Sequence, residues 1–291
     1  MSVRYGRQFF KMTGSGNDFV FFDALTEAPG PLATPDEVRE LCARGTGVGA
    51  DGVVFLEPSE RADFSISYYN ADGSRAALCG NASLCTVRLA VELGIGRPTG
   101  LTFVTDSGII DGRLRDELPE IDLQPVTCVR PVVDVELLAG EQRVGYAEAG
   151  VPHVVVVCDD VERADLNGRG RSLRWNSSFP QGANANFVSG GPDAWRMRTF
   201  ERGVEGETLA CGTGAVATAL LLNSWGLAGT GVELETRSGQ ILGVRMRREP
   251  NGAAWQPSLR GEGRIVYRAA LALESRLGPA SHDGPEWTVA R

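Results

Sequence analysis

Apolar and polar residues alternate along several short stretches of the chain, as in strands that are buried on one face. Residues 63–68 and 197–200 alternate with a period of two. Residues 101–104 and 154–157 are apolar runs rich in β-branched and aromatic side chains. These four segments predict strands that are separated by turns and loops.

A helix is predicted to begin after Thr34. Thr34 and Glu37 have the spacing of a capping box. Pro35 would occupy the first helical position, where its missing N–H loses no hydrogen bond.

A second pattern occurs twice, once at Cys79 and once at Cys211. In each copy a polar turn with glycine leads to a Cys-Gly pair. An apolar stretch follows, and a glycine stands 15 positions after the cysteine (79 to 94, and 211 to 226). A Thr-x-Ser-Gly motif comes next, at Thr105 and at Thr236. The Cys-Gly pair, the later glycine and the Thr-x-Ser-Gly motif recur in the same order at nearly the same spacing. This repeat indicates two homologous domains, each with one central helix.

Strands joined by short turns outnumber helices, so we expect an α+β fold. Each domain would be a mostly antiparallel or mixed sheet rolled around its central helix. We place the domains at residues 1–122 and 123–265, with a linker near 118–126 and with the strand at 266–273 joining the first domain. Residues 274–291 are expected to be an appended tail.

Composition and charge exclude several classes of protein. With 42% hydrophobic and 23% charged residues the chain has the composition of an ordered globular protein. Its net charge of −8, without a basic stripe, argues against a nucleic-acid partner. The chain has no apolar run long enough to span a membrane, and its start lacks the apolar core of a signal peptide. We therefore expect a cytoplasmic protein with reduced thiols and no membrane partner.

Scarce residue types limit the chemistry. Lys11 is the only lysine, and His153 and His282 are the only histidines. The six cysteines form no Cys-x-x-Cys pair, so a zinc site is not expected. Nothing around Lys11 resembles the site of a Schiff-base cofactor. We expect no metal and no cofactor, with catalysis by Cys, Asp, Glu or backbone amides.

The two Cys-Gly turns suggest proton transfer. A thiol at a helix N-terminus lies in positive potential, which favours the thiolate, and the free N–H groups there bind anions. If the two domains face each other, Cys79 and Cys211 would stand on opposite faces of the α-carbon of a bound carboxylate. One thiolate could remove the α-proton while the other thiol donates one, which inverts the centre.

From about residue 10 to 273 the chain also resembles the diaminopimelate epimerases. Four segments carry the resemblance: residues 11–19, 69–81, 150–153 and 201–214. The resemblance implies two domains with the active site in the cleft between them. It also implies a cofactor-independent isomerase of lysine biosynthesis that converts LL- to meso-diaminopimelate.

The resemblance further implies roles for individual residues. Cys79 and Cys211 would be the acid/base pair, with His153 as a supporting group. The reacting carboxylate would be held by Gly80, Asn81, Gly212 and Thr213. The distal amino-acid end would be held by Asn17, Asn70, Asn184, Glu201 and Arg202. Arg matches a carboxylate bidentately and Glu matches an ammonium, so the last two suit that end. The expected partner is a small amino acid, and a homodimer stays open.

Four departures from the family pattern leave the substrate open. Val151 replaces an Asn, residues 82–84 lack a Gly and an Arg, an extra residue stands near Glu205, and Thr13 replaces a His. The second and third are expected to lie on the approach to the thiols. The alternative is a racemase of another polar or cationic amino acid. A non-catalytic or lyase-type relative and a cysteine hydrolase that uses His153 fit less well, since two matched cysteines are retained.

Overall fold

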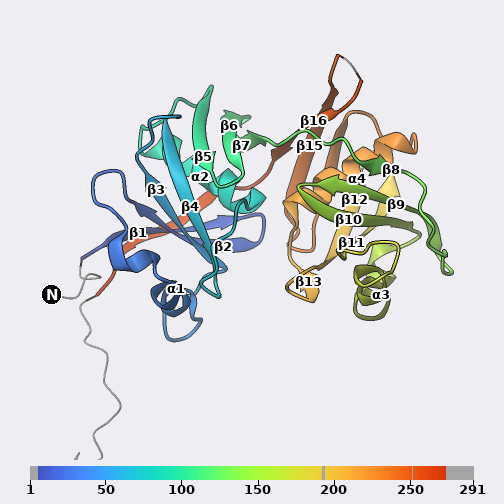
Figure 1. Cartoon of the computed structure of the whole chain (residues 1–291), viewed down its shortest axis with the longest axis horizontal. Coiled ribbons are helices and arrows are strands. Elements are labelled where there is room, and N and C mark those ends of the chain that lie inside the picture. Colours follow the sequence, from blue (N-terminus) through green and yellow to red (C-terminus); the bar gives the residue numbers. More distant parts are fainter. Residues whose placement is uncertain (1–5, 192–193, 251, 273–291) are drawn as a thin grey trace, which may run out of the picture.

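A computed structural model describes residues 6–191, 194–250 and 252–272 of the chain. It has two lobes side by side (Figure 1). The first contains β1 to β7, and the second contains β8 to β16. The last strand, β17, coloured red, returns to the first lobe and pairs with β1. The predicted tail at 274–291 lies outside the described residues. Among the described residues, no helix is long and apolar enough to cross a membrane.

The elements of the first lobe are β1 Gln8–Gly14, β2 Asn17–Asp23, η1 Gly30–Ala33, α1 Pro35–Cys42, β3 Gly52–Glu57, β4 Phe64–Asn70, α2 Gly80–Glu92, β5 Leu101–Thr105, β6 Gly108–Arg115, β7 Leu118–Asp122 and β17 Arg264–Ala270. Those of the second lobe are β8 Val129–Arg130, β9 Glu141–Ala149, β10 Val151–Cys158, η2 Val161–Arg163, η3 Leu166–Gly170, α3 Arg171–Arg174, β11 Asn184–Gly191, β12 Ala194–Glu201, β13 Gly206–Thr208, α4 Gly212–Ser224, β14 Gly231–Glu235, β15 Ile241–Arg248 and β16 Trp255–Arg260. The four strands predicted from the sequence are confirmed as parts of β4, β5, β10 and β12.

One sequence of strand pairings is repeated in both lobes. In the first, β1–β2 is antiparallel, β2–β3 parallel, β3–β4 antiparallel, β4–β5 parallel, and β5–β6 and β6–β7 antiparallel. In the second, the strands β9, β10, β11, β12, β14, β15 and β16 pair in the same order with the same directions. This repetition confirms the duplication and the mixed α+β sheets that the sequence predicts.

Each sheet wraps around one helix. Helices α2 and α4 both have 13 residues, and ten of the residues in each are buried. Gly94 and Gly226 follow them with the same φ of +72°, a left-handed conformation that ends a helix readily at glycine. The two central helices share one apolar core that runs through both lobes. Smaller apolar clusters lie under α1 in the first lobe and under η2, η3 and α3 in the second.

Antiparallel pairing of β7 with β16 joins the two sheets. Residues 118–122 were expected to be part of a linker, but they form β7, which pairs on one side with β6 and on the other with β16. Helix α1 begins at Pro35 as predicted, but Thr34 makes no capping bond to it. Its hydroxyl donates instead to the carbonyl of Pro31, at 2.9 Å.

Candidate active site

Cys79 and Cys211 each stand directly before the first turn of a central helix. Both backbones are extended there, with φ values of −133° and −135°, as at an N-cap. The carbonyl of Cys79 accepts a hydrogen bond from Ser83 N–H, and that of Cys211 accepts one from Ala215 N–H, both at 2.9 Å. Each thiol therefore lies at a helix end whose first N–H groups have no partner within the helix.

The N-termini of α2 and α4 face each other. A Cβ placed on Gly80 would lie 3.8 Å from Cα of Gly212, and one on Gly212 would lie 3.8 Å from Cα of Gly80. These positions are also 3.1 and 2.7 Å from a methyl group of Leu259, in β16. A side chain at either glycine would press on Leu259, so glycine at both positions lets the helix ends approach. The two cysteines are thereby brought together from the two lobes.

A cavity of about 680 Å³ lies between the lobes beside this meeting point. Five of the residues expected in the site line it: Asn17, Asn70, Cys79, Glu201 and Arg202. The others are not part of its lining: Gly80, Asn81, His153, Asn184, Cys211, Gly212 and Thr213. All of these except Thr213 are buried. The cavity therefore opens on the first thiol, and the second thiol lies behind its wall.

Burial raises the pKa of both thiols. The pKa of Cys211 is raised to about 12, first by burial and then by the negative charge of Glu201. Thr213 Oγ1 lies 3.6 Å from Cys211 Sγ and opposes the rise only in part. Burial also raises the pKa of Cys79, again with a contribution from Glu201. The sequence predicted lowered values from the helix N-termini alone. That prediction is wrong for this structure, because the loss of hydration outweighs the N–H groups.

The wall from the first lobe is held by side-chain amides and carboxylates. Asn17 Nδ2 donates to Asp51 Oδ2 at 2.9 Å, and Asn17 Oδ1 accepts from Asn81 Nδ2 at 2.7 Å. Asn17 thus ties the end of the β1–β2 hairpin to the first turn of α2. Arg44 forms ion pairs with Asp51, at 2.8 Å, and with Asp18, at 2.6 Å. The amide of Asn17 is oriented before any ligand is present.

Lys11 contributes to the same wall. Its ammonium is buried, pairs with Asp18 at 2.6 Å and also donates to the carbonyl of Gly49. The chain's only lysine therefore has a structural role at this wall. Asn70, at the end of β4, lines the cavity and donates to Ser74 Oγ at 3.0 Å.

The wall from the second lobe is the hairpin of β12 and β13. Glu201 accepts a hydrogen bond from Thr208 Oγ1 at 2.7 Å, and burial raises its pKa. Arg202 N–H donates to Asn184 Oδ1 at 2.7 Å, and its guanidinium donates to the carbonyl of Gln181 at 3.2 Å. Asn184 therefore holds the backbone at Arg202, so Glu201 and Arg202 are presented together at one end of the cavity.

The extra residue of the second motif lies in the loop of this hairpin. Glu205 has a φ of +56°, a left-handed conformation that is uncommon for residues other than glycine. Its carboxylate accepts from Gly203 N–H and from Arg174 Nε, both at 3.1 Å. These bonds fix a longer loop at the rim of the cavity. The extra residue relative to the family pattern therefore lies in the loop that follows Glu201 and Arg202.

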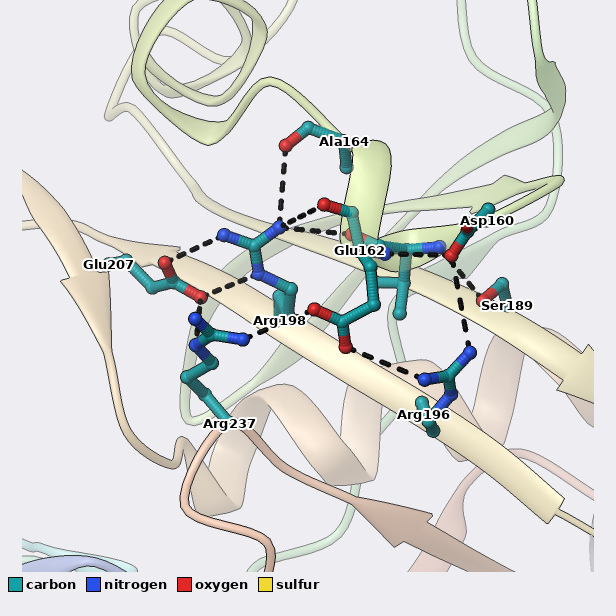
Figure 2. A network of polar contacts seen from close by, with 9 residues as sticks. Asp160, Glu162, Ala164, Ser189, Arg196, Arg198, Glu207 and Arg237 are labelled. Carbon is teal, nitrogen blue, oxygen red and sulfur yellow. Dashed lines mark hydrogen bonds and ion pairs between the residues drawn. The ribbon is translucent and has the colours of Figure 1, made fainter.

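A cluster of charged residues supports the hairpin from outside (Figure 2). Arg198, in β12, forms two bonds to Glu207 of β13, at 2.7 and 2.8 Å. Its Nη1 donates to the carbonyls of Val161 and Glu162, at 3.1 and 3.2 Å. Arg237, from the Thr-x-Ser-Gly hairpin, contacts Glu162 at 3.1 Å. Arg198 therefore fastens the cavity-lining hairpin to η2.

Residues 82–84 do not lie where the sequence suggested. Ala82, Ser83 and Leu84 are buried in α2 and do not line the cavity. A Cβ on Gly261 would lie 3.1 Å from a methyl group of Leu84, so Leu84 packs in the core against the β16–β17 connection. The expectation that these residues remodel the approach to the thiols is wrong. Val151 begins β10 and does not line the cavity either.

His153 is fully buried in β10, and burial, with the nearby charge of Arg202, lowers its pKa to about 3. It is therefore a neutral imidazole at physiological pH. In the parallel pairing of β10 with β11 it stands opposite Asn184. This position places His153 behind the wall formed by the second lobe.

Several residues that line the cavity were missed from the sequence, among them Tyr68, Thr208, Asp51 and Arg44. Asp51 also orients Asn17. Tyr68 stands two positions before Asn70 in β4, so strand alternation could have placed both side chains on one face. The roles of Thr208 and Asp51 depend on contacts between segments distant in sequence, for which the sequence has no local signal.

All six cysteines are free thiols. Among the described residues, no group of three or more His, Cys, Asp or Glu is arranged to hold a metal ion.

The sequence model of one protein family, described as diaminopimelate epimerase, matches residues 9–128 and 145–249. Two curated relatives have the same description. The protein from Gemmatimonas aurantiaca is 48% identical over 274 residues, which cover 91% of this chain and 99% of the relative. The protein from Archaeoglobus fulgidus is 39% identical, and the match covers 80% of this chain and 87% of the relative.

Solved structures share the fold at low identity. A hydroxyproline epimerase from Agrobacterium vitis, with bound trans-4-hydroxy-L-proline, matches 96% of both chains with a TM-score of 0.67 and 20% identity. A phenazine biosynthesis protein of the PhzF family from Bacillus anthracis matches 90% of this chain and 98% of its own, with a TM-score of 0.68 and 15% identity. At these identities the likeness extends to the fold alone.

Proposed function

Because this chain belongs to the diaminopimelate epimerase family, we propose that it inverts one α-carbon of diaminopimelate, from the LL to the meso form. Cys79 and Cys211 are the acid/base pair. The observation that carries the proposal is the meeting of two equivalent helix N-termini, each preceded by a cysteine from a different lobe. That arrangement suits a reaction in which one centre is approached from two opposite faces.

The chemistry needs one thiolate and one thiol. The thiolate of one cysteine takes the α-proton of the substrate. The electron pair of the broken Cα–H bond is delocalised into the substrate carboxylate. The thiol of the other cysteine then donates its proton to the opposite face, which leaves that cysteine as the thiolate. N–H groups at the starts of α2 and α4 stabilise the charge that develops on the carboxylate. Gly80, Asn81, Gly212 and Thr213 hold the carboxylate there.

The distal end of the substrate is recognised by the far wall. Glu201 binds the second ammonium, and Arg202 binds the second carboxylate. Asn17, Asn70 and Asn184 contribute amides directly or by orienting their neighbours. Support comes from Glu201 and Arg202, in the second lobe, lining the same cavity as Cys79 of the first lobe.

Substrate binding also activates the thiols. In the free protein burial and the charge of Glu201 raise the pKa of both cysteines. A bound ammonium neutralises Glu201 and removes part of that effect, so thiolate forms when the substrate is present. His153 supports this wall without changing charge.

The organisation of the whole chain is part of the proposal. An N-terminal domain at 1–122, completed by β17 (Arg264–Ala270, predicted at 266–273), and a C-terminal domain that begins at 123 form the active site between them. The protein acts in the cytoplasm on a small amino acid, without nucleic acid or membrane partners, and a homodimer is one assembly to test by sedimentation.

A second function, racemisation of another polar or cationic amino acid, is suggested by Val151, which replaces an Asn of the family pattern although it does not line the cavity. One missing hydrogen bond costs about 0.5–1.5 kcal/mol, roughly a tenfold effect that alone leaves the substrate class unchanged. A substrate group left buried and unpaired would cost about 1–3 kcal/mol. The longer loop at Glu205 adds a second difference at the distal end of the cavity.

The test is incubation with LL-diaminopimelate in deuterated water. We expect meso product with deuterium at the inverted α-carbon. Replacement of Cys79 or Cys211 by Ala should lower the inversion rate by at least about 10²-fold, as for the loss of a general acid or base. Inversion by either variant at nearly the wild-type rate would contradict the two-base mechanism.

Comparison of kcat/KM for LL-diaminopimelate with that for single-headed amino acids decides the substrate. A preference of more than about a hundredfold for a single-headed amino acid would overturn the leading assignment while leaving the thiol mechanism intact. Val151→Asn is the companion variant. Faster turnover of diaminopimelate would indicate a pocket that has lost one contact, and unchanged or slower turnover one that has repacked around valine.

A further inference from the structure

The phenol of Tyr68 lies beside the first thiol, and the proposed mechanism does not use it. Tyr68, in β4, lines the same cavity as Cys79, and only 8% of the residue is exposed. It belongs to the apolar cluster against which Cys79 packs. The loop after β4 turns back to this strand, since Ala76 N–H donates to the carbonyl of Tyr68 at 3.1 Å. This turn brings the end of the loop, with Cys79, back to Tyr68.

Two neighbours hold the ring of Tyr68 in place. A Cβ placed on Gly52, in the adjacent strand β3, would lie 2.6 Å from Tyr68 Cε2 and 3.1 Å from the phenol oxygen. The ring therefore fills the space that a side chain at position 52 would take. Phe19 packs edge-on against it, with the ring centroids 6.2 Å apart. A buried ring that is packed on two sides keeps its hydroxyl at one place beside the cavity.

The hydroxyl of Tyr68 is a hydrogen-bond neighbour of the Cys79 thiol. Burial raises the pKa of Cys79, whereas the N–H groups of Ala82 and Asn81 and the hydroxyl of Tyr68 lower it. Burial, and then the charge of Cys79, raise the pKa of Tyr68 above its usual range. The phenol therefore stays protonated at physiological pH. It can donate a hydrogen bond to a thiolate, but it cannot take the α-proton of a substrate.

The second thiol also has a hydroxyl neighbour, but from another position of the repeat. Thr213 Oγ1 lies 3.6 Å from Cys211 Sγ, and Thr213 stands two residues after that cysteine. The residue two positions after Cys79 is Asn81, whose amide donates to Asn17 Oδ1 at 2.7 Å instead. The first lobe therefore has no hydroxyl at the position that serves the second thiol.

The strand position of Tyr68 has a different use in the second lobe. Tyr68 pairs with Val54, the third residue of β3, and Thr199 pairs with Asn186, the third residue of β11. The hydroxyl of Thr199 donates to Asn186 Oδ1 at 2.9 Å. Each thiol thus has a hydroxyl neighbour that comes from a position without a counterpart in the other lobe. Such neighbours are not a simple product of the duplication, which points to a use that both thiols share.

We propose that Tyr68 acts in the reaction through Cys79: its phenol donates a hydrogen bond to the Cys79 thiolate and stabilises the charged state that takes the α-proton. No proton leaves the phenol. When the thiolate takes the α-proton an S–H bond forms, and the hydrogen bond to sulfur weakens because the sulfur is no longer charged. The inference deepens the proposed function and rests on it, but the state of the Cys79 thiol can be measured without any substrate.

The first experiment measures the reactivity of each thiol in the free protein. Tyr68→Phe removes the hydroxyl and keeps the buried ring. The pKa of Cys79 should rise by about one unit, and its alkylation by iodoacetamide at fixed pH should become about tenfold slower, since a hydrogen bond to a charged group is lost. The rate at Cys211 should stay the same, because its hydroxyl neighbour is Thr213. Unchanged alkylation of Cys79, or equal slowing at both cysteines, would overturn the inference.

Tyr69→Phe is the matched control. Tyr69 is the next residue of β4, and its ring packs against Phe55 in the apolar cluster under α1, away from the cavity lining. Loss of this phenol should leave the alkylation of both cysteines and kcat unchanged. If Tyr69→Phe slows the alkylation of Cys79 as much as Tyr68→Phe does, the effect does not come from the hydroxyl beside the thiol and the inference is wrong.

The second experiment follows turnover. Tyr68→Phe should lower kcat for diaminopimelate by about tenfold with little change in KM, and should move the rising limb of the pH–rate profile upward by about one pH unit. A merely structural role would raise KM or lower stability and leave that limb in place, which would contradict the inference. If wild-type protein does not turn over diaminopimelate while Tyr68→Phe still slows the alkylation of Cys79, the proposed function fails and the contact between phenol and thiolate is supported.

Discussion

The thiol of Cys211 is subject to two opposing influences. The N–H groups at the start of α4 and the hydroxyl of Thr213 favour the thiolate, whereas burial and the carboxylate of Glu201 favour the thiol. Burial outweighs the N–H groups and the hydroxyl, so the free protein keeps this thiol protonated. A protonated and buried thiol resists oxidation and alkylation, while a bound substrate can still reverse the balance through charge.

The contribution of Glu201 can be measured directly. Glu201→Gln removes a negative charge that raises the pKa of both thiols, so their pKa should fall and their alkylation by iodoacetamide at fixed pH should become faster. Mass spectrometry at a series of pH values gives the rate for each cysteine. Glu205→Gln removes a charge from the same hairpin and is the control, with little effect expected. Slower alkylation in Glu201→Gln would contradict the assigned direction.

The buried imidazole of His153 predicts a pH-dependent stability. Its pKa is about 3 in the folded protein and about 6.5 in an unfolded chain. Between these values the unfolded state binds a proton that the folded state does not. This group's contribution to the free energy of unfolding is therefore full above about pH 6.5 and decreases as the pH falls toward 3.

The slope from one such proton is at most about 1.4 kcal/mol per pH unit. Urea unfolding at pH 4, 5, 6 and 7 should show a smaller decrease for His153→Gln than for wild type. Identical slopes would mean that the folded protein titrates His153 normally. The control is His282→Gln, which isolates the effect of losing one histidine outside the described residues.

At the scale of elements, the helices, hairpins and strands that could be predicted are those marked by a repeated motif or by a local residue pattern. The Cys-Gly turns, the closing glycines and the Thr-x-Ser-Gly motifs located both central helices and the hairpins after them. Strand alternation located β4 and β12. Parallel pairings such as β2–β3 leave no local signal, because they join segments separated by whole loops. The position of Leu84 in the core depends on the packing of Gly261, nearly two hundred residues away, and could not be inferred from the motif at Cys79.

The candidate site was predicted in part, because only some of its residues belong to local sequence motifs. Cys79, Asn17 and Glu201 belong to short motifs, so their place in the cavity could be expected. The loop conformation at Glu205 depends on Arg174, which comes from another element. The pKa values of the thiols depend on how completely the two lobes cover them, which only the assembled fold determines.

The hairpin of β12 and β13 should depend on Arg198. Its five hydrogen bonds go to Glu207 and to three carbonyl oxygens at and just after η2. Arg198→Met removes both close bonds to Glu207 and the side-chain donor of the Glu162 carbonyl, so the free energy of unfolding should fall by about 1–3 kcal/mol. The KM for diaminopimelate should also rise, because Glu201 and Arg202 belong to the same hairpin. Chemical denaturation and steady-state kinetics measure the two effects.

Arg237 provides the matched control for this cluster. Its contacts to Glu162 and Glu207, at 3.1 and 3.7 Å, are half-exposed. Exposed ion pairs contribute less than about 1 kcal/mol, so Arg237→Met should have a small effect on stability. A larger loss in Arg237→Met than in Arg198→Met would show that the buried bonds are not the main support of the hairpin.

At the scale of the molecule, the two lobes are held together by the β7–β16 pairing and by the meeting of two helix ends beside it. Leu259, in β16, lies against both Gly80 and Gly212, so the two connections are adjacent. The cavity lies between the lobes beside the helix ends, so its walls depend on how the lobes are placed.

Oxidation should therefore connect the lobes. A two-electron oxidant such as diamide should convert the thiols of Cys79 and Cys211 to a disulfide, with release of two protons to the reduced oxidant and loss of activity. Dithiothreitol should restore activity. Peptide mapping should find this pair rather than one that includes Cys85, which is buried in the core of α2. If fully inactivated protein contains no disulfide between Cys79 and Cys211, the expected proximity of the two thiols is contradicted.

The return of β17 to the first lobe has a consequence for synthesis on the ribosome. Strand β1 emerges first, but its outer partner spans residues 264–270 and is translated after every other strand. Until then one edge of β1 has unpaired backbone groups, which is the kind of edge that recruits strands from other chains. β7 likewise waits for β16, so both outer edges of the nascent first lobe are open during elongation. We expect the growing chain to be most prone to association before β16 and β17 are made, and the addition of these two strands to close both edges.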